Sequence, residues 1–532
     1  MHRRPAVATC LSLALSLVGV LSVAVSAASQ AHVAQTVGDG AWCWFQDPRA
    51  VHYLGRKDQT YVGSVSSQGD VEIVSQETRT GRIQHSVLAR HLQADDHAAP
   101  GLLVLPDRRI AAFYSEHTGD RLYLRISTRP EDVSSFGAAR VIVRARNSTA
   151  GVTYGNPVYL PAEHRTYLFF RGDDSLPNVM WSDDPGLSSW SKPRPVVAPT
   201  SSYPGLRPYV KYASNGTDAI LLAFTNGHPR DVPNDSVFAM TLSHGVFRTM
   251  TGVALRTLAR LPVPISRSEL LYDGSSRTGK AWVWSAGFGK DGKAVVLYAT
   301  FPSDADHRYW YARWTGTGWH QLMFARAGGS IEADGNEPDY SGGMDLDHAD
   351  PSTLYTSRRL GAQWEIQRWH TSDGGVHFGA PAQLTSGSSA KQVRPVVPWG
   401  PTGEVRLLWM SGRYASWNGG YRTQLHELTT GKSPTTVRMT LGATEVKAGR
   451  ALTISARLVQ GYYGSAVPRV PLVLYATGPD GMPHPIWIAT TDATGLVRFP
   501  VTQVERTTYQ VRFNANATYY PSGSGPGTVA MA

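Results

Sequence analysis

Cysteine is almost absent from this sequence of 532 residues, in which only Cys10 and Cys43 occur. Cys10 lies within residues 1–30, which have the pattern of a removable export signal. Without that segment Cys43 stands alone, so the mature chain is expected to have no internal disulfide. Its stability must then come from packing and from closure of its sheets.

Charged residues are also few, and they form no block of one sign. Asp, Glu, Lys and Arg make up 17% of the chain, and no run of Lys and Arg marks a nucleic-acid site, so no nucleic-acid partner is expected. The formal net charge of +10 falls to +8 because Arg3 and Arg4 leave with the signal. A basic exported protein suits an acidic partner; a generally basic surface without a partner is the alternative.

Long apolar runs are confined to the N-terminus. Residues 1–30 combine Arg3 and Arg4 with an apolar run over residues 11–25 and small residues for cleavage, the pattern of a signal peptide. That run is short for a membrane span and no later segment is long enough, so we expect a secreted protein with no membrane partner. An uncleaved anchor is the alternative.

Glycine, proline and aromatic residues are plentiful. The chain has 52 Gly, 34 Pro, 15 Trp and 24 Tyr, a composition typical of an all-β protein with many turns. Its length predicts at least two domains. Aromatic rings stack on sugar faces, but filling the core is their commoner use.

Residues 95–117, DDHAAPGLLVLPDRRIAAFYSEH, are the unit that organises the chain. The apolar runs GLLVL and IAAFY flank the turn residues PDRR, the pattern of two strands joined by a tight turn. Antiparallel pairing brings the outer ends of such strands together. His97 and His117 are therefore predicted to be neighbours in space.

Similar units begin at residues 154, 206, 340 and 393, and a period of about 50 to 60 residues is typical of propeller blades. Equivalent positions in a closed ring of blades converge on its axis, so these units predict one funnel lined by His, Tyr and Arg. The first equivalent position is held by His97, Tyr154, Arg207, Tyr340 and Arg394. The second is held by His117, Arg171, His228, Arg358 and Arg413.

These repeats predict an all-β protein with a seven-bladed β-propeller over residues 38–430. Residues 182–190 and 372–378 resemble the Asp-box turns of sialidase-type propellers, in which an Asp caps a hairpin. The composition shifts after Glu427, and residues 436–532 alternate as short strands. Segments such as ATTDATGLVRF look like the immunoglobulin-like β-sandwich modules of secreted bacterial enzymes, so we expect an accessory domain there.

Several segments together resemble the BNR-repeat propellers that include polysaccharide lyases, such as ulvan lyases and rhamnose–glucuronate lyases. They are residues 95–117, YGNPVYL, RPYVKYASNGTDAILLAFTNGHPR, DHRYWYARW and YSGGMDLDHADPSTLYTSR, and the resemblance covers residues 38–430. It implies β-elimination at α-L-rhamnosyl-(1→4)-D-glucuronate in an acidic polysaccharide. The catalytic positions that it implies are His97, His117, Tyr154 and Arg171. Substrate contacts are expected from Arg207, His228, Arg230, Tyr340, Arg394 and Arg413.

The chemistry of such a lyase needs these residue types. The enzyme removes the proton at C5 of the uronate and expels the oxygen at C4, which requires the carboxylate charge to be neutralised. Arg171 can do so with a two-pronged ion pair. His97 and Tyr154 are expected to transfer the protons with support from His117, and Tyr154 becomes a base only if a cation such as Arg171 lowers its pKa.

Because arginine carries the charge, no metal ion or other cofactor is expected in the reaction. The acidic loops around Asp235, Asp345 and Asp347 are compatible with a structural calcium ion. We expect a monomer.

Two other functions fit parts of the pattern. A sialidase-like hydrolase would need a Glu to activate Tyr154 and three arginines on the substrate, for which Arg171, Arg207 and Arg394 are available. No Glu is evidently placed for that task. A non-catalytic glycan-binding propeller would keep the aromatics and arginines without needing the His pair. Arg171 could also simply pair with Asp173 or Asp174.

Overall fold

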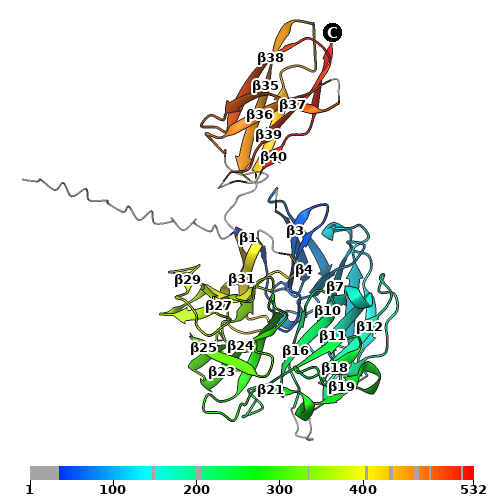
Figure 1. The fold of residues 1–532 in the computed structure, drawn as a ribbon, viewed down its shortest axis with the longest axis vertical. Helices are drawn as coiled ribbons and strands as arrows, with labels where there is room; N and C mark the ends of the chain where they lie inside the picture. The colour runs from blue at the N-terminus through cyan, green and yellow to red at the C-terminus, as the bar shows by residue number, and fades with distance from the viewer. Residues whose placement is uncertain are drawn as a thin grey trace, which may run out of the picture. The chain divides into compact units, whose positions relative to one another are not determined.

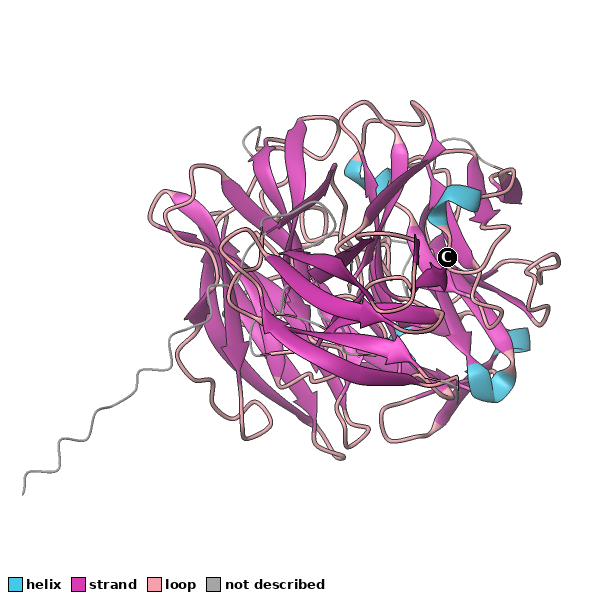
Figure 2. Cartoon of the chain, turned by 90° about the horizontal axis from the view of Figure 1, so that it is seen from above, coloured by secondary structure: helices cyan, strands magenta, loops and turns pink. Residues whose placement is uncertain are grey.

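The computed structural model describes residues 35–532, apart from residues 79, 147–149, 199–205, 333–334, 402–404, 430–434, 461–465, 479–480, 517–518 and 520. The expected signal peptide, residues 1–30, lies outside the described residues. Strands dominate the structure, and the helices are single 3-10 turns (Figure 2). Among the described residues, no helix is long and apolar enough to cross a bilayer. The all-β prediction is confirmed.

Seven antiparallel sheets, counted over the described residues, succeed one another from residue 35 to residue 429 (Figure 1). The first three comprise β2 (Ala50–Leu54), β3 (Asp58–Val65), β4 (Val71–Glu77) and β5 (Ile83–Ala89); β6 (Gly101–Val104), β7 (Ile110–Ser115), β8 (Arg121–Ile126) and β9 (Arg140–Arg144); and β10 (Thr153–Leu160), β11 (Arg165–Arg171), β12 (Pro177–Ser182) and β13 (Arg194–Pro195). The fourth comprises β15 (Val210–Ser214), β16 (Ala219–Thr225), β17 (Val237–Ser243), β18 (Val246–Arg248), β19 (Ala254–Thr257) and β21 (Glu269–Tyr272).

The remaining three sheets have four strands each. They comprise β22 (Ala281–Phe288), β23 (Ala294–Ser303), β24 (Asp306–Trp314) and β25 (Trp319–Gly328); β26 (Met344–Leu346), β27 (Thr353–Leu360), β28 (Gln363–His370) and β29 (Ala382–Gln383); and β30 (Lys391–Val396), β31 (Val405–Tyr414), β32 (Tyr421–Thr429) and β1 (Gln35–Asp39). Short connecting elements are β14 (Val197–Ala198), β20 (Val263–Pro264), η1 (Asp96–Ala98), η2 (Val133–Ser135), η3 (Pro161–Glu163), η4 (Leu258–Arg260) and η5 (Ile265–Arg267).

The central strands are buried on both faces because neighbouring sheets pack face to face. In β16 and β23 nearly every residue is buried, although successive side chains point to opposite faces. The apolar runs of these strands therefore fill two interfaces at once. This explains why their sequences read as continuous apolar stretches rather than as clean alternation.

The ring closes with the N-terminal strand. Strand β1 pairs with β32, so the last sheet contains the first strand of the chain. The predicted start of the propeller, residue 38, falls inside β1. Strand β1 is too short for its partner to be read from its sequence alone.

Both expected Asp-box turns are confirmed. Asp184 accepts hydrogen bonds from the backbone N–H groups of Gly186 and Ser188 at 2.8 and 2.7 Å. Asp373 accepts one from the N–H of His377 at 2.9 Å. Each carboxylate caps its turn and takes no part in the cluster of candidate site residues.

Residues 435–532 form two further sheets with a core of their own. One contains β33 (Thr435–Leu441), β35 (Arg450–Gln460) and β38 (Leu496–Gln503). The other contains β34 (Glu445–Val446), β41 (Gly527–Met531), β39 (Thr507–Phe513), β36 (Pro471–Thr477), β37 (Pro483–Thr490) and β40 (Ser522–Gly523). Ile454, Leu472, Phe499 and Val511 are fully or almost fully buried between them. The immunoglobulin-like character of this part stays a prediction.

One buried carboxyl group makes the closing sheet sensitive to pH. Glu427 on β32 is 1% exposed, and Gln76 on β4 donates a hydrogen bond to one of its oxygens. Burial raises the pKa of Glu427 to about 8, although the hydrogen bond from Gln76 opposes the rise. The folded protein therefore holds a proton that the unfolded chain releases near pH 4.5, so stability falls as the pH rises from about 4.5 to about 8.

We expect Glu427→Gln to stabilise the protein above pH 8, on the order of 5 kcal/mol for a pKa raised from about 4.5 to about 8, because the amide needs no proton. Thermal unfolding midpoints between about pH 5 and about pH 9 would measure the effect. The difference in unfolding midpoint between variant and wild type should increase with pH. A gap that does not change with pH would show that Glu427 does not cause the slope.

Candidate active site

The innermost strands bring the candidate residues to one end of the sheets. Tyr154 lies near the start of β10, and His97 lies in η1, just before β6. The next strand of each sheet is antiparallel, so its end returns to the same place: His117 follows β7 and Arg171 ends β11. The predicted neighbours His97 and His117 are confirmed, with stacked rings whose centroids lie 4.0 Å apart.

Asp95 holds both imidazoles. Its Oδ1 lies 2.7 Å from Nδ1 of His97, and its Oδ2 lies 3.0 Å from Nδ1 of His117. Asp95 also caps η1 by accepting the backbone N–H of His97. Trp417 meets both rings edge-on. These contacts leave Nε2 of each imidazole as the nitrogen available to a ligand.

The two imidazoles differ in charge at neutral pH. Burial would lower the pKa of His97, but Tyr154 and Cys43, followed by the carboxylates of Asp95 and Asp96, outweigh it and hold that pKa well above its usual value. Burial and the charge on His97 lower the pKa of His117 to about 4, against the pull of Asp95. His97 is therefore the charged ring, while His117 keeps a free lone pair.

Arg171 lies against two tyrosines. Its guanidinium is 4.7 Å from the ring centre of Tyr154, and its Nη1 donates a hydrogen bond to the hydroxyl of Tyr209 at 3.1 Å. Asp174, one of the two expected ion-pair partners, instead accepts hydrogen bonds from the Leu176 N–H and the Asn178 side chain. In the described part of the chain no carboxylate forms an ion pair with Arg171, which leaves its charge available to an anionic ligand.

The backbone aims Tyr154 by a strained conformation. Tyr154 has a φ of 65°, which an aromatic residue rarely adopts, and lies where the pairing of β10 with β11 shifts register. Asn156 steadies this bulge by donating to the carbonyl of Tyr154 and accepting from the N–H of Asp47. Strain of this kind costs about 1–3 kcal/mol and is typical of functional sites.

Arg171 does not bring the pKa of Tyr154 below its usual value. Burial raises the pKa of Tyr154 well above its usual value, although His97 and Arg171 oppose the rise. The hydroxyl therefore keeps its proton near neutral pH. In the resting protein Tyr154 is a proton donor.

His228 packs against Tyr209, and Arg230 follows His228 two residues later in the chain. The His228 ring is 5.4 Å from the Tyr209 ring and 4.3 Å from that of Trp282. Its Nδ1 accepts the N–H of Arg230, so its proton sits on Nε2, 3.4 Å from Oε2 of Glu337. Burial, aided by arginines 207, 230 and 171, lowers the pKa of His228 well below its usual value. It is a neutral donor.

Several expected substrate contacts need correction. Arg394 is 1% exposed, and its guanidinium is enclosed by aromatic rings with all three nitrogens buried. Like Tyr154, Arg394 has a positive φ, here 56°, and lies at a bulge of its strand. Its side chain, however, is buried in the core. Tyr340, 3% exposed, is one of the rings that enclose it.

Arg413 and Arg358 do not join the cluster. Arg413 is exposed, while its neighbour Tyr414 is buried and donates a hydrogen bond to Asp96 at 2.6 Å. Adjacent strand residues face opposite sides, so the repeat alignment was off by one residue here. Arg358 donates hydrogen bonds to the backbone of Arg326 and to Gln367, away from the cluster. Arg207 is partly exposed and pairs with an aspartate outside the cluster.

Sequence reasoning missed some residues of the site. Tyr209 lies two residues after Arg207 in the segment RPY. Aligning the repeat units two residues later would therefore have identified it. Asp95 could have been found because an acid two residues before a His can cap the turn that carries it. Glu337 comes from a loop, and no signal in the sequence places it.

By distance alone, two groups of the described side chains could hold a metal ion. They are Cys43, Asp96 and His97, and Asp95, His97 and His117. Both groups include His97, whose Nδ1 the carboxylates of Asp95 and Asp96 already engage. The loops expected to bind calcium form no such group among the described residues, and Asp345 instead accepts hydrogen bonds from Ser285 and the N–H of Val397. A structural calcium ion stays a prediction.

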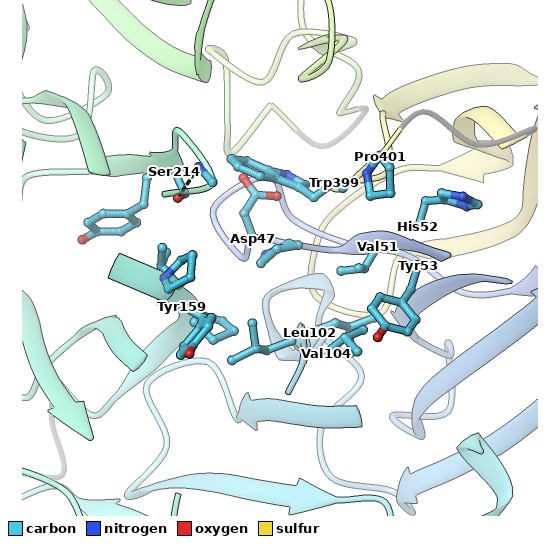
Figure 3. Close-up of a pocket in the computed structure, with 18 residues that line it drawn as sticks. Asp47, Val51, His52, Tyr53, Leu102, Val104, Tyr159, Ser214, Trp399 and Pro401 are labelled. Carbon is cyan, nitrogen blue, oxygen red and sulfur yellow. Dashed lines mark hydrogen bonds between the residues drawn. The ribbon is translucent and has the colours of Figure 1, made fainter. Parts of the chain in front are cut away.

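A separate pocket of about 290 Å³ lies at the other ends of the innermost strands (Figure 3). Tyr159 lines it near the end of β10, whereas the site residue Tyr154 lies near the start of the same strand. Its one carboxylate, Asp47, is neutralised by ion pairs. This pocket is larger than the cavity of about 20 Å³ lined by Tyr154 and Arg171, but none of His97, His117, Tyr154 and Arg171 lines it.

Comparison with known proteins agrees with this architecture. A family model described as "BNR repeat-containing family member" matches residues 59–327, about half of the chain. The chain belongs to the BNR repeat-containing family. No curated protein matches the sequence.

Solved structures resemble this BNR-repeat protein in fold. An ulvan lyase of polysaccharide lyase family PL25 is 17% identical, with a TM-score of 0.57, over 75% of this chain and 96% of the lyase. The β-propeller domain of the Trilobed protease from Pyrococcus furiosus is 10% identical, with a TM-score of 0.38, over 72% of this chain and 96% of that domain. The likeness to the lyase identifies the fold as that of a β-propeller.

Proposed function

We propose that this BNR-repeat protein is an exported polysaccharide lyase that cleaves an acidic polysaccharide by β-elimination. The bond is α-L-rhamnosyl-(1→4)-D-glucuronate, and the product carries an unsaturated uronate. One observation carries the proposal: Arg171 lies beside Tyr154 without a carboxylate partner in the described chain, and Tyr154 lies beside two imidazoles that share Asp95. The fold of the similar ulvan lyase supports it.

Arg171 binds the uronate carboxylate. Its surroundings are largely buried, so an ion pair is stronger there than in water. Neutralising the carboxylate makes the C5 proton acidic enough to be removed, because the developing negative charge spreads onto the oxygens that Arg171 holds. Tyr209 keeps the guanidinium in place.

The protons move between the substrate and two side chains. His117 takes the C5 proton on Nε2 while its Nδ1–H stays on Asp95, and Tyr154 gives its hydroxyl proton to the departing O4. Two observations support His117 over His97 as the acceptor: it is the neutral ring, and its side chain is 19% exposed against 3% for His97. The positive charge of His97 stabilises the intermediate. No metal ion is required for these steps.

An assay of the full chain tests the proposal. The purified protein is offered a panel of uronate glycans, and the unsaturated product is followed by its absorbance near about 235 nm. Rising absorbance with gum arabic or another rhamnose–glucuronate glycan supports the lyase. Release of free sugar without absorbance would overturn it in favour of a hydrolase, and binding without either product would leave a glycan-binding propeller.

The C-terminal part is proposed to be an immunoglobulin-like accessory module. Its core is formed by its own two sheets, and the ring of seven sheets closes through β1 and β32 without it. A chain ending at residue 434 is therefore expected to fold as a monomer and to cleave soluble substrate at close to the full-length rate. Insoluble or inactive truncated protein, judged by size-exclusion chromatography and the absorbance assay, would contradict this.

A further inference from the structure

Four charged side chains form a continuous ladder beside the proposed uronate site. Arg207 Nη2 lies 2.9 Å from Asp231 Oδ2, Asp231 Oδ1 lies 3.2 Å from Arg230 Nε, and Arg230 Nη1 lies 2.5 Å from Glu337 Oε1. We call Arg207, Asp231, Arg230 and Glu337 the rim ladder. It contains two arginines and two carboxyl groups, and burial raises the pKa of one of these, Glu337, to about 7 although Arg230 opposes the rise.

The rim ladder lies close to Arg171, the proposed clamp for the uronate carboxylate. Arg207 is two residues before Tyr209, whose hydroxyl accepts from Arg171. Arg230 and Asp231 follow His228, whose ring packs against Tyr209. A sugar linked to a uronate that is bound at Arg171 would therefore lie within reach of this ladder.

Its members are partly open to solvent. The side chains of Arg207, Asp231 and Arg230 are 30%, 35% and 40% exposed, whereas Glu337 is 6% exposed and anchors Arg230 from below. The exposed edges offer both donors and an acceptor. A sugar hydroxyl can donate to Asp231 and accept from either arginine.

The charge balance of the ladder contrasts with that of Arg171. In the described chain Arg171 has no carboxylate ion-pair partner, so it suits an anion, whereas each rim arginine is already paired. A sulfate ester at the rim would lie next to Asp231 and Glu337, and such like-charge contacts are unfavourable. Its binding would require breaking ion pairs that a hydroxyl leaves intact.

We propose that the rim ladder is a subsite for a neutral, hydroxyl-bearing sugar next to the uronate, and that Asp231 and Glu337 exclude a sulfated one. The inference rests on the proposed function for the position of the uronate. Asp231 acts as the direct acceptor and as the counter-charge of both arginines. Glu337 is a positioning residue that holds Arg230 in the ladder.

Calorimetric binding to the full chain carrying Tyr154→Phe, which blocks turnover, tests this. Two rhamnosyl-glucuronate oligosaccharides are compared that differ only in a sulfate on the rhamnose. The unsulfated one is expected to bind about 10-fold more tightly. Adding Asp231→Asn should bring the two affinities to within about 2-fold, because the freed arginines accept the sulfate.

Asp291→Asn is the matched control, since Asp291 pairs with Arg313 at 2.7 Å in the turn between β22 and β23. It should leave the 10-fold ratio unchanged. Glu337→Gln, which keeps the shape of the side chain, should lower the ratio in the same direction as Asp231→Asn and serves if that variant does not fold.

Equal or tighter binding of the sulfated ligand by the parent protein, or an unchanged ratio in the rim variants, overturns the inference. Failure of the proposed function is distinguishable. If the wild-type chain gives no unsaturated product but the expected affinity ratio is found, the lyase assignment fails and the selectivity stands. If the product forms but the ratio is absent, the lyase assignment stands and the selectivity fails.

Discussion

Arg171→Lys is expected to lower kcat/KM by about 10²–10³-fold, the usual cost of losing one preorganised donor to developing negative charge, while the fold survives. A lysine ammonium cannot bind a carboxylate with two parallel hydrogen bonds, stack on the Tyr154 ring and donate to Tyr209 at once. Most of the loss should appear in kcat, because the clamp acts most strongly in the transition state. Initial rates from the absorbance assay and a thermal melt measure both parts.

Arg165→Lys provides the control for this variant. Arg165 lies at the other end of the same strand, β11, and pairs with Asp183 at 2.6 Å on the surface. Its replacement should leave the rate close to that of the wild type. If Arg171→Lys keeps wild-type turnover as well, Arg171 is not the carboxylate clamp.

Tyr154→Phe is expected to lower kcat by about 10²-fold or more, because it removes the proton that the leaving oxygen needs. The ring and its packing remain, so the thermal midpoint should change little. His97→Ala and His117→Ala should each cost about 10²-fold or more, because His117→Ala removes the base that takes the C5 proton and His97→Ala removes the positive charge that stabilises the intermediate. His377→Ala, which breaks an exposed pair with Asp373, serves as the control.

The result for Tyr154→Phe discriminates between roles. Retention of more than about a third of the wild-type kcat would rule out the hydroxyl as the proton donor. Tyr154 would then be a positioning residue for Arg171, and its loss would appear mainly in KM.

The sequence allowed the neighbours His97 and His117 to be predicted because strand pairing imposes their proximity. Two apolar runs around a tight turn have one antiparallel arrangement, and it brings their outer ends together whatever the side chains are. Tyr154 and Arg171 follow from the same rule in the next sheet. This part of the site is a consequence of pattern.

Other parts depend on details that pattern does not contain. The positive φ values of Tyr154 and Arg394 arise at bulges, and a bulge shifts the side-chain phase by one residue. Tyr154 and Arg394 occupy similar bulged positions, yet Tyr154 faces the site and Arg394 fills the core. The protonated state of Tyr154 depends on burial, which only the packed sheets define.

The pairing of β1 with β32 has a consequence for how the protein is made and handled. The hydroxyl of Thr423 donates to the carbonyl of Gly40, 383 residues earlier in the chain, so the first strand has no partner until almost the whole ring has been synthesised. Contacts of such high sequence separation form slowly. A protease or a cloning boundary that removes Gln35–Asp39 would leave β32 as an open edge, and such edges promote aggregation. Recombinant versions should therefore start no later than residue 35, with any tag placed upstream.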